Sequence, residues 1–371
     1  MKKILLAAGG NAGLLRCIPL FTALGEQHRY EVAFAGSAPA QAGAGGEDMP
    51  ALFGVADAYV AVETGSGSAV RQTVSAMTHF DQLLAQERPD FMMIAGDNDL
   101  ALSAALCASS HGVAYAALDA GLRTGDRNSA VERNRRMIDA VADVLFVSEH
   151  SGLYNLVNEG VDEERIFFTG NLAIDSLAAM MPGANSSEVL SRLGLEEKRY
   201  ALVLLCDPFL HDSLEDLKVL EHAVRAVAER QQVLMLLDSE VEALLQQHEM
   251  LPAFTSLDSV QVIPRTGYSE LLRLVKDALF VMTDSSLAQA ESTVMKVPCL
   301  TMRTSTVSPV TVERGSNMLV GDGEDILLQR IGDALDGKLA SRTKIPEKWD
   351  GASSQRVIEV LDRLLLPNTR S

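Results

Sequence analysis

Short apolar runs alternate along the chain with longer segments whose apolar residues recur at helical spacing. In the first half the runs are nearly continuous in apolar character, which is typical of parallel strands that helices cover on both faces. They occupy residues 4–8, 31–35, 91–95, 114–118 and 144–147, and helical patterns occupy residues 14–24, 69–86 and 100–110. This alternation predicts a doubly wound α/β domain with a parallel sheet.

The same alternation returns in the second half of the chain. Strands are predicted at residues 200–205, 233–237, 260–263, 279–283 and 299–302, with helices at residues 214–230 and 268–275. Residues 180–187 read MMPGANSS, and this cluster of Pro, Gly, Asn and Ser predicts a linker or hinge between the halves. A chain of 371 residues also suits two domains better than one.

The predicted fold class is therefore α/β, with two Rossmann-like doubly wound domains facing a central cleft. We expect the N-terminal domain to span residues 1–175 and the C-terminal domain residues 176–351. Residues 352–367 have apolar residues at helical spacing and are expected to form a closing helix that packs back on the first domain. Residues 36–46, rich in Ala and Gly, predict a flexible loop.

The chain is acidic, with a formal net charge of −18 and a pI of about 4.8. Such a surface repels nucleic acid and anionic membranes at long range, so neither is an expected partner. A small anionic ligand is not excluded, because a local cluster of arginines can bind it. The candidates are Arg16, Arg123, Arg135 and Arg303. The four cysteines lack metal-site spacing and lie in apolar stretches, which predicts buried reduced thiols.

The beginning of the chain has some features of a signal peptide. Two lysines precede the apolar run at residues 4–8. This run is shorter than the roughly 7–15 residues of a signal-peptide core, so a first strand is expected instead. No stretch approaches the ~20 apolar residues of a membrane span. These features predict a cytoplasmic protein.

Polar loops after the predicted strands are the expected places for chemistry, because open α/β sheets bind ligands beyond the carboxyl ends of their strands. The glycine-rich residues 9–13 open a helix and, with Arg16, could bind a phosphate or simply permit a tight corner. Asp97 and Asp99 follow the strand at residues 91–95. Asp99 is the expected N-cap of the next helix, which leaves Asp97 as the functional candidate.

Asp119 follows the strand at residues 114–118 and is expected beside Asp97. Two carboxylates held close together raise the pKa of one of them, which suits a general acid or base near neutral pH. The equally weighted alternative is a structural ion pair between Asp119 and Arg123. The charged residues 132–139 form either a solvated helix face or part of the cleft.

A second candidate site follows the predicted strand at residues 279–283. Ser285 and Ser286 open a helix there, and hydroxyl and N–H groups at a helix N-terminus suit a diphosphate. Glu291 lies further along this helix and could accept hydrogen bonds from ribose hydroxyls. The alternative for this segment is an ordinary helix cap. The seven histidines form no metal-binding motif, so no metal site is predicted.

Short fragments spread over the chain form an ordered set. They are ERPDFMMIAGD (87–97), AGLRTGD (120–126), NRRMID (134–139), TGNLAID (169–175), TDSS (283–286) with Glu291, RTSTVSP (303–309), RGSNMLVG (314–321) and DGASSQRVIEVL (350–361). Together they resemble the UDP-N-acetylglucosamine 2-epimerase family. The resemblance covers nearly the whole chain, and the ordered set is specific although each fragment is short.

The resemblance implies a fold of the glycosyltransferase B type. It also implies epimerisation of UDP-N-acetylglucosamine at C2 to UDP-N-acetylmannosamine, by elimination and re-addition of UDP. Acid/base roles are implied for Asp97, Asp119 and Glu132. Substrate-binding roles are implied for Arg16, Arg135, Leu271, Ser285, Ser286, Glu291 and Arg303. A UDP-sugar substrate, no metal or redox cofactor, a homodimer and a place in polysaccharide biosynthesis are implied as well.

The chain also departs from the family pattern. The differences are Asn11 for arginine, Arg16 for lysine, Asp119 for glutamate, Val131 for one of two adjacent acids, residues 206–209 (CDPF) for HRRE, Leu287 for glycine and Ser308 for arginine. Two alternatives stay open: a hydrolysing 2-epimerase or glycosyltransferase acting on a related nucleotide sugar, and a catalytically impaired sugar-nucleotide-binding paralogue. The enzymatic interpretations require the loops of Asp97 and Asp119 to meet the helix start at residues 285–291 across one shared gap.

Overall fold

The computed structural model describes residues 1–38, 48–65, 67–206, 213–321, 323–339 and 343–366. Its internal contacts divide the chain into two units. The first unit comprises the described residues of Met1–Pro39, Asp48–Ala178 and Glu347–Ser371, and the second unit comprises those of Ala179–Pro346. Most of the loop predicted at residues 36–46 lies outside the described residues.

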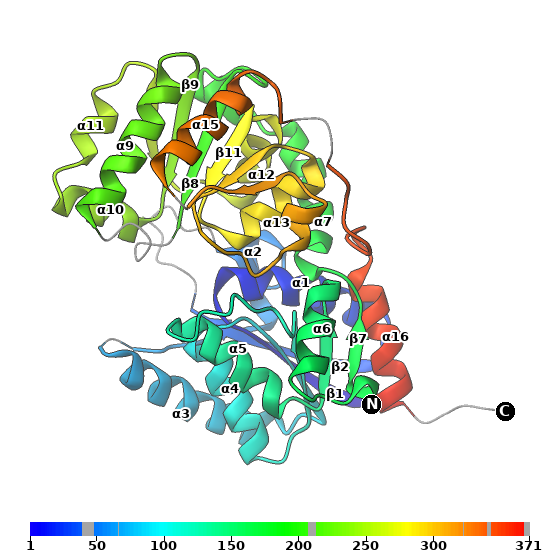
Figure 1. The fold of residues 1–371 in the computed structure, drawn as a ribbon. Helices are drawn as coiled ribbons and strands as arrows, with labels where there is room; N and C mark the ends of the chain where they lie inside the picture. The colour runs from blue at the N-terminus through cyan, green and yellow to red at the C-terminus, as the bar shows by residue number, and fades with distance from the viewer. Residues whose placement is uncertain (39–47, 66, 207–212, 322, 340–342, 367–371) are drawn as a thin grey trace. The chain divides into compact units, whose positions relative to one another are not determined.

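The first unit is built on a seven-stranded parallel sheet in the order β3-β2-β1-β4-β5-β6-β7 (Figure 1). The strands are β1 Lys2–Ala8, β2 Tyr30–Ser37, β3 Tyr59–Val62, β4 Phe91–Ala95, β5 Tyr115–Leu118, β6 Val144–Val147 and β7 Ile166–Phe168. The helices are α1 Gly10–Glu26, α2 Met49–Leu52, α3 Ala69–Glu87, α4 Asp99–Ser110, α5 Ala130–Val141, α6 His150–Asn158, α7 Leu172–Ser186, which runs into the second unit, and α16 Ser353–Leu365, with 3₁₀ turns at Ala56–Ala58 and Glu163–Arg165.

Helices cover both faces of this sheet. Because β2 and β4 lie on opposite sides of β1, right-handed crossovers send the connecting helices to opposite faces. In agreement, α1 packs against α16, whereas α4 packs against α3 and α5. All five residues of the central strand β4 are buried. The apolar run at residues 91–95 is continuous because helices cover this strand on both faces.

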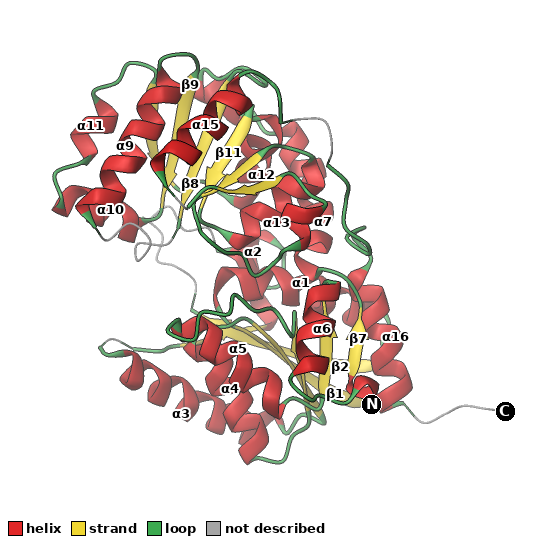
Figure 2. Ribbon diagram, viewed as in Figure 1, coloured by secondary structure: helices red, strands yellow, loops and turns green. Residues whose placement is uncertain are grey.

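The second unit repeats this architecture with a six-stranded parallel sheet in the order β10-β9-β8-β11-β12-β13 (Figure 2). The strands are β8 Tyr200–Leu205, β9 Gln232–Leu237, β10 Val260–Pro264, β11 Phe280–Thr283, β12 Cys299–Thr301 and β13 Asn317–Leu319. The helices are α8 Val189–Leu193, α9 Leu214–Ala228, α10 Ser239–Gln247, α11 Leu251–Thr255, α12 Tyr268–Asp277, α13 Ser286–Met295, α14 Val310–Glu313 and α15 Glu324–Leu335. The predicted fold class, α/β with two Rossmann-like doubly wound domains, is confirmed.

Residues 180–187, predicted as a linker or hinge, are helical up to Ser186 and do not form an irregular linker. Helix α7 continues through this segment to Ser186 and contains Pro182. A proline inside a helix removes one backbone hydrogen bond, but buried side chains can outweigh that cost. Ile174 and Leu177 are buried before the proline, and Ala184 is buried after it. Internal contacts change from the first unit to the second within this helix, between Ala178 and Ala179.

The closing segment of the chain is tied into the first unit by specific bonds. The Asp175 carboxylate accepts from the backbone N–H of Ser353 at 3.0 Å and of Ser354 at 2.7 Å, so it caps the start of α16. The indole N–H of Trp349, which is almost fully buried, donates to the carbonyl oxygen of Ser148 at 2.9 Å. Helix α16 then packs against α1.

Candidate functional site

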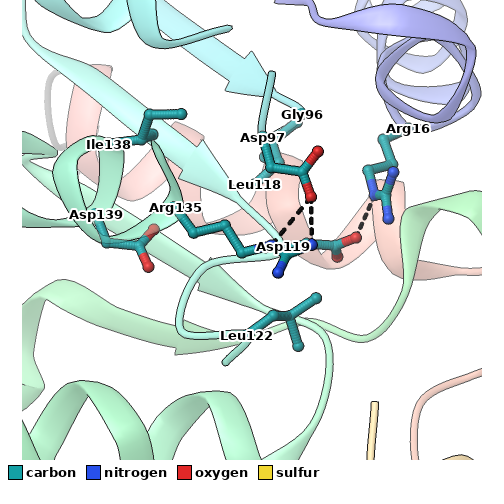
Figure 3. A pocket seen from close by; sticks show the side chains of 9 residues that line it. All are labelled: Arg16, Gly96, Asp97, Leu118, Asp119, Leu122, Arg135, Ile138 and Asp139. Carbon is teal, nitrogen blue, oxygen red and sulfur yellow. Dashed lines mark hydrogen bonds and ion pairs between the residues drawn. The ribbon is translucent and has the colours of Figure 1, made fainter. Parts of the chain in front are cut away.

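The loops after β4 and β5 bring the two predicted acids into one pocket. Asp97 follows β4 after a single residue, Gly96, and Asp119 follows β5 directly. Gly96 has a φ of +118°, and a Cβ atom there would come within 2.8 Å of the Gly9 carbonyl oxygen, so the close approach of the loop after β4 to the turn after β1 requires glycine. The pocket has a volume of about 30 Å³, enough for one small group. It is lined by Arg16, Gly96, Asp97, Leu118, Asp119, Leu122, Arg135, Ile138 and Asp139 (Figure 3).

Each acid in this pocket has its own arginine partner. Arg135 reaches from α5 to the Asp97 carboxylate, with Nε at 3.0 Å and the second nitrogen at 2.5 Å. Arg16 reaches from α1 and pairs with Asp119. Figure 3 shows the two carboxylates lying between the two arginines. Burial by itself lowers the pKa of the Arg16 guanidinium, but the charges of Asp119 and Asp97 outweigh burial and raise it.

The two acids differ in how accessible they are. The Asp97 side chain is 41% exposed, whereas the Asp119 side chain is 8% exposed. The alternative ion pair between Asp119 and Arg123 is wrong, because Arg123 pairs with Asp139 at 2.7 Å and with Glu159 at 2.8 Å. The Arg123 side chain is only 5% exposed and is engaged by these two acids, so it does not contribute to a local basic pocket.

Two acids of α5 hold the loop that carries Asp119. Asp119 has a φ of +55°, in the left-handed region that aspartate tolerates better than most residues. Asp139 accepts from the backbone N–H of Gly121 at 2.9 Å, and Glu132 accepts from the backbone N–H of Thr124 at 3.0 Å. Burial raises the pKa of Asp139, while its ion pair with an arginine opposes that rise. Buried carboxylates therefore fix the loop at Gly121 and at Thr124.

Glu132 is fully buried on α5 and has several partners at once. Besides Thr124, it forms ion pairs with Arg136 at 3.2 Å and with Arg135 at 3.7 Å. Among the described residues, Glu132 is not one of those that line the pocket. Its carboxylate contacts Arg135 and the loop of Asp119. Its catalytic role stays a prediction.

Helix α4, which follows the loop after β4, has a different N-cap residue from the one predicted. Asn98, not Asp99, is the N-cap of α4, and its side-chain oxygen accepts from the backbone N–H of Ala101 at 3.1 Å. Asp99 instead accepts from the side-chain amide of Asn134 at 3.0 Å. The same amide donates to the carbonyl oxygen of Asp97 at 3.2 Å, so Asn134 ties α5 to the loop that carries Asp97.

The glycine-rich segment at residues 9–13 is the first turn of α1 rather than a free loop. The N–H of Gly10 is already occupied, because it donates to the Ser37 hydroxyl at 2.9 Å. A Cβ atom on Gly13 would lie 2.6 Å from the Ala95 carbonyl oxygen, so this glycine permits α1 to pack closely on β4. The packing alternative accounts for both glycines, and the phosphate-binding role stays a prediction.

In the second unit, the predicted serines open α13 as expected. Ser285 is the N-cap, with its hydroxyl accepting from the backbone N–H of Ala288 at 3.4 Å, and Ser286 is exposed. Arg303, from the loop after β12, donates through Nε to the carbonyl oxygen of Asp284 at 2.6 Å. An arginine and a helix N-terminus thus lie together at the carboxyl end of the sheet, where both favour an anion.

Glu291 lies deeper on the same helix. It is 1% exposed and accepts from the Tyr268 hydroxyl at 2.8 Å. Burial raises the pKa of Glu291 to about 7, while the Tyr268 hydrogen bond and the charge of Arg265 oppose the rise. Leu271 on α12 is 3% exposed, so its side chain presents almost no surface to a ligand in this structure. Its predicted contact with a base stays a prediction.

Sequence reasoning did not select three residues that stand out in the second unit: Asp238, Arg265 and Tyr268. Asp238 follows β9 directly and Arg265 follows β10 directly. Arg265 donates to both oxygens of the Asp238 carboxylate at 3.0 Å. The signal for Asp238 and Arg265 was present, because polar residues that follow strands are the usual ligand contacts of such sheets.

The described part of the chain holds no group of three or more His, Cys, Asp or Glu side chains arranged to hold a metal ion. No described helix is long and apolar enough to cross a membrane. All four cysteines are free. Cys17, Cys107 and Cys299 are buried as predicted, whereas Cys206 is partly exposed.

Known proteins resemble the chain in sequence. The model of the UDP-N-acetylglucosamine 2-epimerase family matches residues 43–362. A UDP-N-acetylglucosamine 2-epimerase from Methanocaldococcus jannaschii is 30% identical over 302 residues, which cover 80% of this chain and 82% of that protein. A UDP-2,3-diacetamido-2,3-dideoxy-D-glucuronate 2-epimerase from Pseudomonas aeruginosa is 27% identical over 315 residues, covering 80% and 82%.

Solved structures agree with these sequence matches. The Methanocaldococcus jannaschii UDP-GlcNAc 2-epimerase in complex with UDP-GlcNAc and UDP has a TM-score of 0.88, at 26% identity and with 97% of this chain and 99% of that chain covered. The Neisseria meningitidis UDP-GlcNAc 2-epimerase, at 19% identity and a TM-score of 0.87, shares the fold, with 97% of this chain and all of that chain covered. The extent of the family match and of the 30% identical relative shows that this chain belongs to the UDP-N-acetylglucosamine 2-epimerase family of isomerases.

Proposed function

We propose that this chain converts UDP-N-acetylglucosamine to UDP-N-acetylmannosamine by inverting the configuration at C2 of the sugar. The observation that carries the proposal is the pocket in which Asp97 and Asp119 lie together, each held by an arginine. The relative from Methanocaldococcus jannaschii, which was crystallised with UDP-GlcNAc and UDP, supports the choice of substrate. No cofactor is required by this chemistry.

The proposed reaction needs two groups that exchange protons. One carboxylate removes the proton from C2, the C1–O bond to UDP breaks, and a C1=C2 double bond forms in a 2-acetamidoglucal intermediate. UDP then adds back to C1 while a proton returns to C2 on the opposite face. Because the proton leaves one face and arrives at the other, two separate acids serve the two faces. Asp97 and Asp119 fill these roles, with Arg135 and Arg16 orienting them.

We propose that the second unit binds the nucleotide. The N-terminus of α13, with Ser285 and Ser286, and the guanidinium of Arg303 bind the diphosphate, because aligned N–H groups and a cation both stabilise its charge. Glu291 accepts from the ribose hydroxyls, with Tyr268 bonded to Oε1 of the same carboxylate. The contact of Leu271 with the base rests on the family resemblance.

Glu132 is proposed to act through its neighbours rather than on the sugar itself. Its carboxylate fixes Thr124 in the loop of Asp119 and contacts Arg135, which holds Asp97. A shift of about 1 Å in either acid costs on the order of 100-fold in rate, so a residue that holds both is important for turnover.

Incubation with UDP-N-acetylglucosamine in deuterated water tests the proposal. We expect deuterium at C2 and accumulation of UDP-N-acetylmannosamine, both followed by proton NMR, and neither with Asp97→Asn. Release of free N-acetylmannosamine and UDP would instead identify a hydrolysing epimerase, and transfer of the sugar to an acceptor would identify a glycosyltransferase. Binding of the nucleotide sugar without exchange at C2 would identify a catalytically impaired protein.

We also propose that the chain acts as a homodimer in the cytoplasm. Both assignments rest on the family resemblance. Sedimentation equilibrium tests the first, with about twice the mass of a 39.9 kDa chain expected. A single-chain mass at micromolar concentration would contradict it. Recovery of the protein in the cytosolic fraction tests the second assignment.

A further inference from the structure

Cations are scarce at the carboxyl edge of the second sheet. The loops that follow its six strands contain two lysine or arginine residues in the sequence, Arg265 after β10 and Arg303 after β12. The loop after β8, from Cys206 to Ser213, contains none. A bound diphosphate carries at least two negative charges, which need cations or N–H donors once water is excluded.

The Arg265 side chain lies over several strand ends. One of its terminal nitrogens donates to both oxygens of Asp238, which follows β9. Its charge acts on Glu291 of α13 and on Cys206 at the end of β8. The guanidinium therefore reaches from the end of β10 to the end of β9, within electrostatic range of Cys206 and Glu291. The sheet order reverses between β8 and β11, and ligands of open α/β sheets bind at such a reversal.

The guanidinium also has donors available for a ligand. The hydrogen bonds with Asp238 use one nitrogen, and among the described residues no bond is recorded for Nε or for the other terminal nitrogen. The side chain is 26% exposed, so these groups can be reached. An arginine that is fixed by a carboxylate on one side presents its remaining donors in a rigid, planar fork that matches phosphate oxygens.

We infer that Arg265 binds the diphosphate of the nucleotide sugar together with Arg303 and the N-terminus of α13, and that Asp238 orients Arg265. The inference rests on the proposed function and assigns a residue outside the predicted set to the binding site. The sequence of the loop after β8 has no arginine or lysine, and Arg265 supplies a cation near Cys206, the residue that follows β8.

Binding of UDP and uridine by Arg265→Gln tests the inference. Because one charge-assisted contact to phosphate is lost, UDP affinity should fall roughly 10- to 100-fold, measured by isothermal titration. Uridine affinity, measured by ligand-observed NMR, should change less than about threefold. Arg230→Gln is the matched control, because Arg230 pairs with Asp336 at 2.9 Å and lies before β9, at the amino end of the sheet. Its UDP affinity should equal that of the unmodified chain.

Asp238→Asn separates ligand binding from a purely structural ion pair. This change breaks the same ion pair but keeps the cation, so UDP affinity should fall less than about threefold. Equal losses in Arg265→Gln and Asp238→Asn, or an unchanged ratio of UDP to uridine affinity in Arg265→Gln, would overturn the inference while leaving the proposed function intact. Failure of the unmodified chain to bind UDP would instead overturn the proposed function.

Discussion

The carboxyl edges of the two sheets differ in where their arginines come from. In the first unit the loops after the strands carry acids, Asp97 and Asp119, and the arginines that hold them come from helices. In the second unit the loops carry arginines, Arg265 and Arg303, as well as acids, and Arg265 after β10 pairs with Asp238 after β9. In the proposed function, the edge of the first sheet transfers protons and the edge of the second sheet binds the diphosphate. The proposal therefore assigns the chemistry of each unit to side chains at the strand ends and not to the fold.

Replacing Asp97 with asparagine should give the largest effect and should affect the first unit alone. Removing a group that transfers a proton typically costs 100- to 10,000-fold, so we expect kcat to fall about 1,000-fold. UDP affinity, which we assign to the second unit, should stay within about threefold of that of the unmodified chain. Steady-state kinetics and isothermal titration provide the two readouts. Retention of more than about a tenth of kcat would rule out Asp97 as an acid/base group.

Replacing Glu132 with alanine should mainly destabilise the first unit. The change removes a fully buried carboxylate that pairs with Arg135 and Arg136, although each arginine keeps a second acid. Removing one partner of a buried ion pair costs about 3 kcal/mol. Urea unfolding measures the loss in the free energy of unfolding. Glu26→Ala, at an exposed position on α1, is the control and should change it by less than about 0.5 kcal/mol. Equal stability of the two variants would contradict the assigned contacts.

Glu291 should make the stability of the second unit depend on pH. Burial raises the pKa of this carboxyl from 4.5 to about 7, so between these values the folded chain retains a proton that the unfolded chain has lost. Its contribution to stability is complete below about pH 4.5 and is lost as the pH rises through about 7. The loss amounts to at most about 3 kcal/mol.

Comparison of the unmodified chain with Glu291→Gln isolates this contribution. The difference in unfolding free energy between pH 5 and pH 8 should be smaller in the variant, because glutamine does not titrate. Chemical denaturation at the two pH values provides the measurement. Identical pH dependence in both proteins would show that Glu291 is not the buried titrating group.

Replacing Arg303 with glutamine should have the smallest of these effects and should act on the second unit alone. We expect UDP affinity to fall about tenfold, because one charge-assisted contact to the diphosphate is lost. The Asp97 ion pair in the first unit is untouched, so the free energy of unfolding of that unit should not change. An unchanged UDP affinity would remove Arg303 from the site.

Strands that are buried on both faces could be predicted from the sequence with accurate ends. The predicted bounds of β4, β6 and β8 match the structure residue for residue, because continuous apolar runs end where the chain leaves the core. The short strands β3, β7 and β13 were not predicted. Two lie at edges of the first sheet and one at an edge of the second, where little burial is available to leave an apolar signal.

Predictions from short sequence segments were wrong or incomplete where contacts between distant residues determine the structure. The Pro and Gly around residue 182 suggested a linker, but burial of residues on both sides of Pro182 keeps the segment helical. The acids Asp97 and Asp119 could be identified because they follow strands. Their partners could not, because Arg16 is 103 residues from Asp119 along the chain.

The most direct test of the account is a crystal structure of the Asp97→Asn variant with bound UDP-N-acetylglucosamine. We predict that the diphosphate oxygens lie within hydrogen-bond distance of Ser286 and Arg303. We also predict that C2 of the sugar lies within about 3.5 Å of the side chain at position 97 or of the Asp119 carboxylate. A nucleotide bound away from the start of α13, or a C2 atom out of reach of both side chains, would contradict the division of labour between the two sheets.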